Sequence, residues 1–374
     1  MSQDNTKIEV TMKQALPLVK DVLRAKLVPN LLSSPGIGKS ALAKMIAKVW
    51  NLKLIDVRLS QADPSDLNGF PMILQHTLQR LKGEPHARPK AGYIPMETFP
   101  IKGDPLPVKT WKEVNGEMVP DEYYAGWLIL MDEFNSATLN VQAAAYKIVL
   151  DKMVGMHLLH SHCHQIAAGN LMTDKAIVMR LSTAMQSRVT HLVIRVCNIS
   201  WDEWAEQEQI DHRVRSFMKY RPKLLHNFKP DHDDLTFACP RTWEMTSKII
   251  MPMEKVLAEK LPIIAGTVGV GAAREFRAYC GVFDKIPTIK DILADPTGCK
   301  LGDEPSVHYA LAGLVGHHLS PANADKLIPF IMRIGIDFQA VTIRGAVARD
   351  YSLINTPFVK DWVTSNSKEL MQDD

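Results

Sequence analysis

The chain has 374 residues, of which 46% are hydrophobic and 23% charged, and its formal net charge is +3. These values are typical of a globular protein with more than one domain, and the small net charge gives no indication of a nucleic-acid partner. We expect a cytoplasmic protein, because no apolar run is long enough to span a membrane, no apolar signal segment follows Met1, and the five cysteines are scattered.

The first predicted elements surround residues 33–40, which have the sequence Ser-Ser-Pro-Gly-Ile-Gly-Lys-Ser. An apolar strand at 27–32 precedes this loop and a helix-forming run at 41–50 follows it, which is the context of a phosphate-binding P-loop. Backbone N–H groups and the helix dipole would attract phosphate, Lys39 would contact the outer phosphates, and the Ser40 hydroxyl would ligate Mg²⁺. The residues predicted to bind ATP here are Ser34, Pro35, Gly36, Ile37, Gly38, Lys39, Ser40 and Ala41. The alternative is a glycine turn before an ordinary helix, because Ser33 stands where the usual pattern opens with glycine.

Residues 70–125 form an insert in which eight prolines argue against long regular helices. Within it, Asn115 and Gly116 lie between two strand-like runs, a pattern that favours a two-residue hairpin turn. Two interpretations remain open. The insert contacts a substrate or partner, or it is a surface excursion that packs on its own core.

A second chemical motif follows at residues 127–133. Five apolar residues, Trp127 to Met131, predict a strand that is buried on both faces, as in a parallel sheet. Asp132 and Glu133 then lie at its carboxyl end, where open α/β sheets bind their ligands. Asp132 would hold Mg²⁺, directly or through water, and Glu133 would polarise the attacking water. The alternative is a strand that ends in solvated acids, which Lys39 upstream makes weaker.

Three later polar residues fit the same site. Asn170 ends a predicted strand at 165–170 and would orient the water or sense the γ-phosphate. Arg188 could be a finger presented to a neighbouring subunit, with Arg180 as a rival for that role, and Arg241 begins a helical run from which it could contact the nucleotide.

The remainder of the chain is predominantly helical in pattern from residue 202 onward. A basic run at 213–229 carries interleaved aromatic residues and could bind nucleic acid. Its apolar spacing favours instead an amphipathic helix with a solvated basic face.

The order of these motifs resembles that of the AAA+ ATPases and, within them, the MoxR-like branch with a helix-2 insert. The segments that carry the resemblance are the P-loop, 59–69, 132–137, 141–142, 168–170, Arg188 and 240–241. It implies a ring, usually a hexamer, with ATP at subunit interfaces. It assigns Lys39 and Ser40 to Walker A, Asp132 and Glu133 to Walker B, Asn170 to sensor 1, Arg188 to the trans-acting arginine finger and Arg241 to sensor 2. The chain departs from the family pattern at Ser33, at Ser136, where an arginine is common, and in the long stretch between Gly69 and the Asp132 strand.

We therefore expect an α/β P-loop AAA+ core at 1–200, with a parallel sheet flanked by helices and the insert at 70–125. A helical lid at 201–280 and a helical C-terminal extension at 281–374 would follow. The expected cofactors are ATP and Mg²⁺, the metal being held by Ser40 and Asp132, and the expected catalytic residues are Glu133, Asn170 and Arg188.

The expected activity is ATP hydrolysis by a ring that remodels or matures a protein partner, which the resemblance suggests often carries a von Willebrand A domain. Two alternatives belong to other classes: a nucleic-acid motor or translocase, and a slow nucleotide-gated scaffold. No membrane partner is expected.

Overall fold

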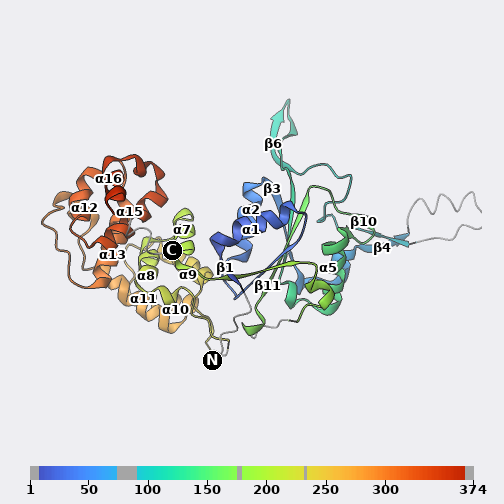
Figure 1. Ribbon diagram of the computed structural model, residues 1–374, viewed down its shortest axis with the longest axis horizontal. Coiled ribbons are helices and arrows are strands. Elements are labelled where there is room, and N and C mark those ends of the chain that lie inside the picture. Colours follow the sequence, from blue (N-terminus) through green and yellow to red (C-terminus); the bar gives the residue numbers. More distant parts are fainter. Residues whose placement is uncertain (1–7, 74–90, 175–178, 231–233, 367–374) are drawn as a thin grey trace, which may run out of the picture. The chain divides into compact units, whose positions relative to one another are not determined.

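The computed structural model describes residues 8–73, 91–174, 179–230 and 234–366 (Figure 1). The chain divides into two compact units, Met1–Arg195 and Val196–Asp374, which we call the α/β unit and the helical unit and describe separately. This division falls close to the predicted end of the core at residue 200. The further boundary at residue 280 remains a prediction, and one helix of the helical unit runs across that position.

A six-stranded sheet forms the centre of the α/β unit, in the order β1-β12-β2-β11-β8-β3 and with every neighbouring pair parallel (Figure 1). The strands are β1 Glu9–Thr11, β2 Pro29–Ser33, β3 Leu52–Arg58, β8 Gly126–Asp132, β11 Cys163–Asn170 and β12 Thr190–Arg195. The predicted parallel sheet is confirmed, as are the strands expected to end at Asp132 and Asn170. Because parallel strands require long crossovers, helices connect most of them.

The helices of the α/β unit cover both faces of this sheet. In the described residues they are α1 Met12–Arg24, α2 Lys39–Val49, α3 Pro64–Asn68, α5 Leu139–Asp151 and α6 Thr183–Gln186, with short 3-10 helices at η1 Leu59–Gln61, η2 Phe134–Ser136 and η3 Met172–Asp174. Leu128 and Leu130 pack in one apolar cluster with α1 and α2, whereas Ile129 and Met131 pack in another with α5. Successive side chains of a strand point to opposite faces, so the apolar run of β8 is buried on both sides as predicted.

The insert contains two antiparallel strand pairs, β4 Phe70–Ile73 with β5 Ala91–Ile94 and β6 Val108–Val114 with β7 Glu117–Tyr123. The predicted hairpin is confirmed, because Asn115 (φ 54°) and Gly116 (φ 84°) form its turn in the left-handed region that such turns require. Figure 1 shows the β6–β7 hairpin projecting from the α/β unit. Two shorter strands, β9 Met153–Val154 and β10 His157–Leu158, form a separate pair.

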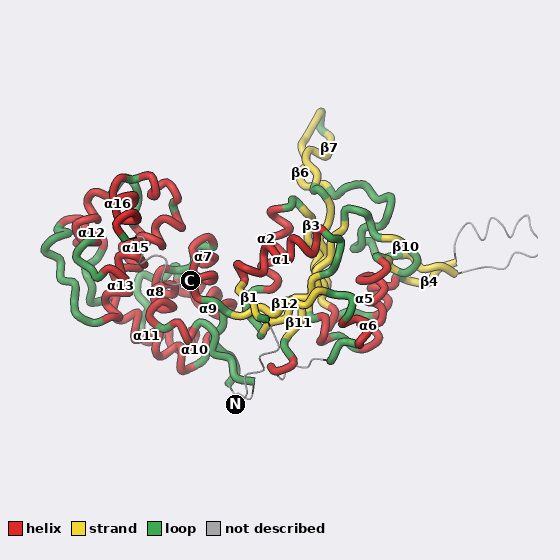
Figure 2. The backbone as a smooth tube through the Cα atoms, in the orientation of Figure 1, coloured by secondary structure: helices red, strands yellow, loops and turns green. Residues whose placement is uncertain are grey.

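The described part of the helical unit consists of helices and loops (Figure 2). Its α-helices are α7 Asn198–Gln207, α8 His212–Tyr220, α9 Pro240–Ile250, α10 Leu261–Val268, α11 Val270–Phe283, α12 Ile289–Ala294, α13 Pro305–His318, α14 Ala324–Ile331, α15 Ile336–Arg349 and α16 Pro357–Ser365, with 3-10 helices at η4 Pro222–Leu224, η5 Ala258–Lys260 and η6 Tyr351–Asn355. One apolar cluster joins α7 to α11 around Trp243, and a second joins α12 to α15 around Phe330.

In the part of the chain that the structure describes, every helix is too short or too polar to cross a lipid bilayer.

Candidate functional site

The carboxyl ends of three adjacent strands bring the predicted site residues together. β11 lies between β2 and β8, and its last residue, Asn170, pairs in register with Ser33 at the end of β2. On the other side of β8, Asp132 pairs in register with Arg58 of β3. The loops that follow these strands therefore meet at one edge of the sheet, which is where α/β folds place their ligands.

The loop after β2 has the backbone shape that an anion-binding loop needs. Gly36 (φ 78°) and Gly38 (φ 113°) adopt the left-handed region, and Gly38 precedes the first residue of α2. Gly38 has no side chain with which to cap the start of this helix, and the start of a helix attracts anions. The hydroxyl of Ser34 donates to a carboxylate oxygen of Asp174 on η3 at 3.2 Å, which ties the loop to the segment that follows β11.

Lys39 is buried at the base of this loop, with only 8% of its surface exposed. Its ammonium donates to the Ser33 carbonyl at 3.2 Å, the Ser33 hydroxyl at 3.0 Å and the Asn170 side-chain oxygen at 3.1 Å. All three of these acceptors are uncharged. Ser33, the departure from the usual loop pattern, thus adds a side-chain acceptor for the lysine, which glycine lacks.

Ser40, the residue after Lys39 on α2, lies beside Asp132 at the end of β8. The Ser40 hydroxyl donates to Asp132 Oδ2 at 2.9 Å, so the two oxygens predicted to hold Mg²⁺ share one location. Hydroxyl and carboxylate oxygens are the donor set that Mg²⁺ prefers, and a site with few protein ligands matches its habit of keeping water molecules. Burial raises the pKa of Asp56 on β3, and the Asp132 carboxylate raises it further, while the cations Arg58 and Lys44 oppose this shift.

Glu133 adopts an unusual backbone conformation directly after the strand, with a φ of 57°. Non-glycine residues rarely adopt this region, and such strain is concentrated at functional sites. Its N–H donates to Asp132 Oδ1 at 2.8 Å, and its carboxylate accepts a hydrogen bond from the hydroxyl of Ser60 on η1. Ser60 therefore occupies one face of the carboxylate that is expected to act on water.

The two finger candidates both lie on the exposed surface of the α/β unit. The Arg188 guanidinium donates to the Ala184 carbonyl at 2.7 Å and lies 5.3 Å from the centre of the Tyr146 ring. Arg180 is also exposed. Arg241 is exposed at the first turn of α9 in the helical unit. The roles expected of these arginines remain predictions.

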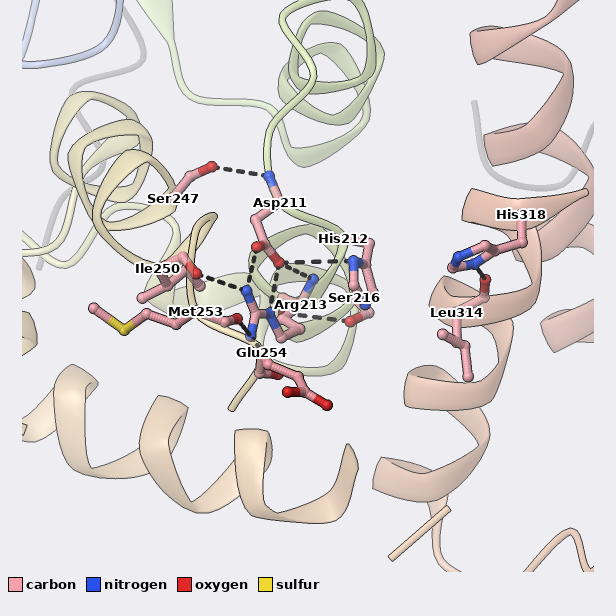
Figure 3. Close-up of polar contacts among 10 residues, drawn as sticks. All are labelled: Asp211, His212, Arg213, Ser216, Ser247, Ile250, Met253, Glu254, Leu314 and His318. Atoms are coloured by element: carbon pink, nitrogen blue, oxygen red, sulfur yellow. Dashed lines mark hydrogen bonds and ion pairs between the residues drawn. The ribbon is translucent and has the colours of Figure 1, made fainter. Parts of the chain in front are cut away.

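Three cations of the basic run at 213–229 form ion pairs inside the helical unit, whereas Arg221, Lys223 and Lys229 are exposed. Arg213 donates to both carboxylate oxygens of Asp211, at 2.9 Å and 2.6 Å, and to the carbonyls of Ile250 and Met253 near the end of α9 (Figure 3). Arg215 pairs with Asp202 at 3.0 Å and with Glu206, and Lys219 pairs with Asp202 at 3.0 Å. The exposed basic face predicted for this helix is therefore wrong for these three cations, because carboxylates of neighbouring segments hold them inside the helical unit.

Sequence reasoning missed several residues that contact the site, among them Ser60 and Asp174. Ser60 lies in the segment 59–69 that carried the family resemblance, but its contact with Glu133 depends on the position of η1 beside β8. Asp174 follows Asn170 by four residues, and only the turn of η3 brings its carboxylate to Ser34. Nothing in the local sequence of either residue marks these contacts.

Comparisons with known proteins give remote structural likenesses. The chain is similar to a candidate ATPase from Cytophaga hutchinsonii, with 13% identity and a TM-score of 0.33 over 90% of this chain and 81% of that chain. It is also similar to the RuvB Holliday junction branch migration motor of Thermotoga maritima, with 11% identity and a TM-score of 0.34 over 89% of this chain and 88% of that chain. No family model and no curated protein matches the sequence.

Proposed function

We propose that this protein is an ATP hydrolase of the AAA+ class, of the MoxR-like kind, that works as a ring on a protein partner. The observation that carries the proposal is the convergence of Lys39, the Ser40–Asp132 pair and Glu133 at one edge of a parallel sheet. Phosphoryl transfer requires a cation for the phosphates, oxygens suited to Mg²⁺ and a carboxylate that acts on water. Lys39, the Ser40–Asp132 pair and Glu133 are groups of these kinds.

Binding would rest on the loop at 34–38 and on Lys39. The N–H groups at the start of α2 would donate to phosphate oxygens, and the Lys39 ammonium would exchange some of its neutral acceptors for the outer phosphates. Ser40 and Asp132 would hold Mg²⁺, which when bound neutralises charge on the phosphates.

Hydrolysis would then depend on Glu133 and Asn170. The Glu133 carboxylate would orient a water molecule and accept its proton, after exchanging the Ser60 hydroxyl for that water. The Asn170 side chain, which accepts from Lys39, would contact the terminal phosphate or the water. In a ring, Arg188 of a neighbouring copy would stabilise the charge that develops on the transferred phosphoryl group. Arg241, in the helical unit, would contact the same nucleotide.

Two observations favour a protein partner over nucleic acid. The β6–β7 hairpin exposes 54% of Trp111 and 61% of Met118, and apolar side chains of this kind are typical of protein contacts. Its charged residues are two lysines and four acids, namely Lys109, Lys112, Glu113, Glu117, Asp121 and Glu122. A net negative hairpin repels a phosphate backbone. The buried pairing of Arg213, Arg215 and Lys219 also withdraws three of the six cations of the basic run from a nucleic-acid surface.

The test is the steady-state ATPase rate of the purified protein over a series of protein concentrations, with and without single- and double-stranded DNA. We expect turnover that rises steeply with protein concentration, because the finger acts between copies, and that is indifferent to DNA. Stimulation by DNA at moderate salt would replace the protein-remodelling role by a nucleic-acid motor. Absence of turnover in the assembled state would favour the nucleotide-gated scaffold.

A further inference from the structure

The side chain of Asn135 binds the backbone of Asn170 from across the site. Asn135 lies on η2 and is 5% exposed. Its amide nitrogen donates to the Asn170 carbonyl at 2.7 Å, and its side-chain oxygen accepts from the Asn170 N–H at 3.0 Å. One carboxamide therefore satisfies both backbone groups of a single residue.

The contact between Asn135 and Asn170 lies just beyond the point where β11 stops pairing with β8. The register between β11 and β8 runs from Cys163 opposite Trp127 to Ala167 opposite Met131, and β8 ends one residue later. Beyond that point the β8 side of β11 has no strand beside it, while the other side still pairs with β2 as far as Asn170. The Asn135 carboxamide takes the place of the missing strand, since it presents a donor and an acceptor as a backbone does.

Gly169 gives the carboxamide room for this close approach. A Cβ atom on Gly169 would lie 2.5 Å from the Asn135 side-chain oxygen, which is closer than two such atoms can be. The absence of a side chain at 169 thus lets the carboxamide lie against the end of the strand.

Asn135 also belongs to the turn that carries Glu133. The Ser136 N–H donates to the Glu133 carbonyl at 2.9 Å, which closes the turn between them. Asn135 consequently joins the turn of Glu133 to the strand end of Asn170, and the Asn170 side chain in turn accepts from Lys39 at 3.1 Å. The two groups expected to act on water and on the terminal phosphate are connected through this one buried side chain.

We propose that Asn135 is a positioning residue, which sets the distance between Glu133 and Asn170 so that both contact the same terminal phosphate and water. This inference rests on the proposed ATP hydrolysis. Asn135 itself would touch neither the nucleotide nor the water and would act through Asn170. Misplacement of a reacting group by about 1 Å can slow a reaction roughly a hundredfold, so a positioning role predicts a large effect on rate.

The experiment compares Asn135→Ala, Asn170→Ala and the double variant in the full-length chain. We expect Asn135→Ala to lower kcat by about tenfold to a hundredfold, with KM for ATP changed far less, because the phosphate loop is intact. If Asn135 acts through Asn170, the double variant will be no slower than Asn170→Ala alone. The proposal would be overturned if the fold-loss of kcat in the double variant equalled the product of the losses in the two single variants. An unchanged kcat in Asn135→Ala would overturn it as well.

A matched control separates positioning from general stability. Asn30 is equally buried, on β2 of the same sheet, and its side-chain nitrogen lies 3.1 Å from His191 Nδ1. We expect Asn30→Ala to lower the melting temperature while retaining kcat. Should Asn135→Ala fail to fold, Gly169→Ala provides a second route, because its new methyl group displaces the carboxamide and leaves both asparagines in the chain. Gly169→Ala must then reproduce the loss of kcat, and a normal kcat in this variant would contradict the proposal.

A second readout needs no hydrolysis and so distinguishes failure of this inference from failure of the proposed function. The increase in melting temperature is measured with saturating ATPγS and with saturating ADP. If Asn170 contacts the terminal phosphate, the melting temperature of the wild-type protein will increase more with ATPγS than with ADP. Asn170→Ala and Asn135→Ala will each lose this difference to the same extent. A wild-type chain that shows this difference without turnover would refute hydrolysis alone. An Asn135→Ala variant that keeps the full difference would refute the positioning role alone.

Discussion

The buried cations of the two units make different kinds of hydrogen bond. In the helical unit, Arg213 is bound by both oxygens of Asp211 and donates further to the carbonyls of Ile250 and Met253 (Figure 3). In the α/β unit, the Lys39 ammonium donates to uncharged oxygens of Ser33 and Asn170. Carboxylate acceptors neutralise a cation, whereas neutral oxygens satisfy its hydrogen bonds without adding opposite charge. The ion pair of Arg213 indicates a role in stability, whereas under the proposed function Lys39 would exchange some of its acceptors for phosphate oxygens.

The largest effect that tests this comparison is expected at an arginine on the surface. If Arg188 acts on the nucleotide of a neighbouring copy, Arg188→Ala will slow hydrolysis by ~10³- to 10⁵-fold and leave folding intact. Mixing this variant with Lys39→Ala should restore some turnover, because a mixed ring contains interfaces with both intact residues. Arg180→Ala is the matched variant. If it carries the large loss and Arg188→Ala does not, the finger is Arg180.

The next effect concerns the carboxylate at the end of β8. Glu133→Gln keeps the size of the side chain but removes the base, so we expect hydrolysis to slow by ~10²- to 10⁴-fold. Nucleotide binding, measured by equilibrium titration with a fluorescent ATP analogue, should persist. Glu122→Gln on the hairpin, where Glu122 pairs with Lys109 at 3.2 Å, serves as the control and should turn over normally. Turnover by Glu133→Gln near the wild-type rate would refute its role as the base.

Removal of a structural cation should affect stability instead of rate. Arg213→Met leaves the Asp211 carboxylate buried without its partner, so we expect a loss of ~3–5 kcal/mol in the free energy of unfolding. Denaturant unfolding of the full-length chain measures it. Arg24→Met is the control, because Arg24 pairs with Asp21 at 3.0 Å on the surface with 67% of its side chain exposed, and such pairs contribute at most ~1 kcal/mol. Equal losses in the two variants would contradict the role assigned to the buried pair.

The smallest expected effect is the pH dependence of the helical unit. Burial lowers the pKa of His212 from 6.5 to about 4, and the neighbouring His317, Arg213 and His318 also lower it, while Asp211 opposes them. Between these pH values the unfolded chain binds a proton at His212 and the folded chain does not, so stability falls as the pH falls. From pH 7 to pH 5 this amounts to about 2 kcal/mol. Unfolding at both pH values in wild type and His212→Asn measures it, and an unchanged dependence in the variant would exclude His212 as the source.

Local sequence patterns predicted the strands and loops of the candidate site well. The apolar run before Asp132 and the strand before Asn170 are in place, and Asn115 and Gly116 make the predicted turn. These features depend on neighbours in the chain, because strand burial follows the order of apolar residues and the hairpin turn follows the backbone freedom of its two central residues.

Contacts between distant segments could not be predicted in this way. The interpretation of 213–229 as a solvated basic face was wrong for Arg215 and Lys219, because the acids that bind them, Asp202 and Glu206, come from α7. The contacts of Ser60 with Glu133 and of Asp174 with Ser34 join segments 73 and 140 positions apart. No pattern within either partner segment specifies such a pair.

The sequence by itself determined that a glycine loop with Lys39 and Ser40 follows one strand, and that Asp132 and Glu133 follow another. Only the tertiary structure decided that β11 lies between those strands, so that Asn170 contacts Lys39 from one side and Asn135 from the other. The reason is physical: residue order sets backbone preference and which faces are apolar, whereas strand order in a sheet is set by packing among all the elements at once.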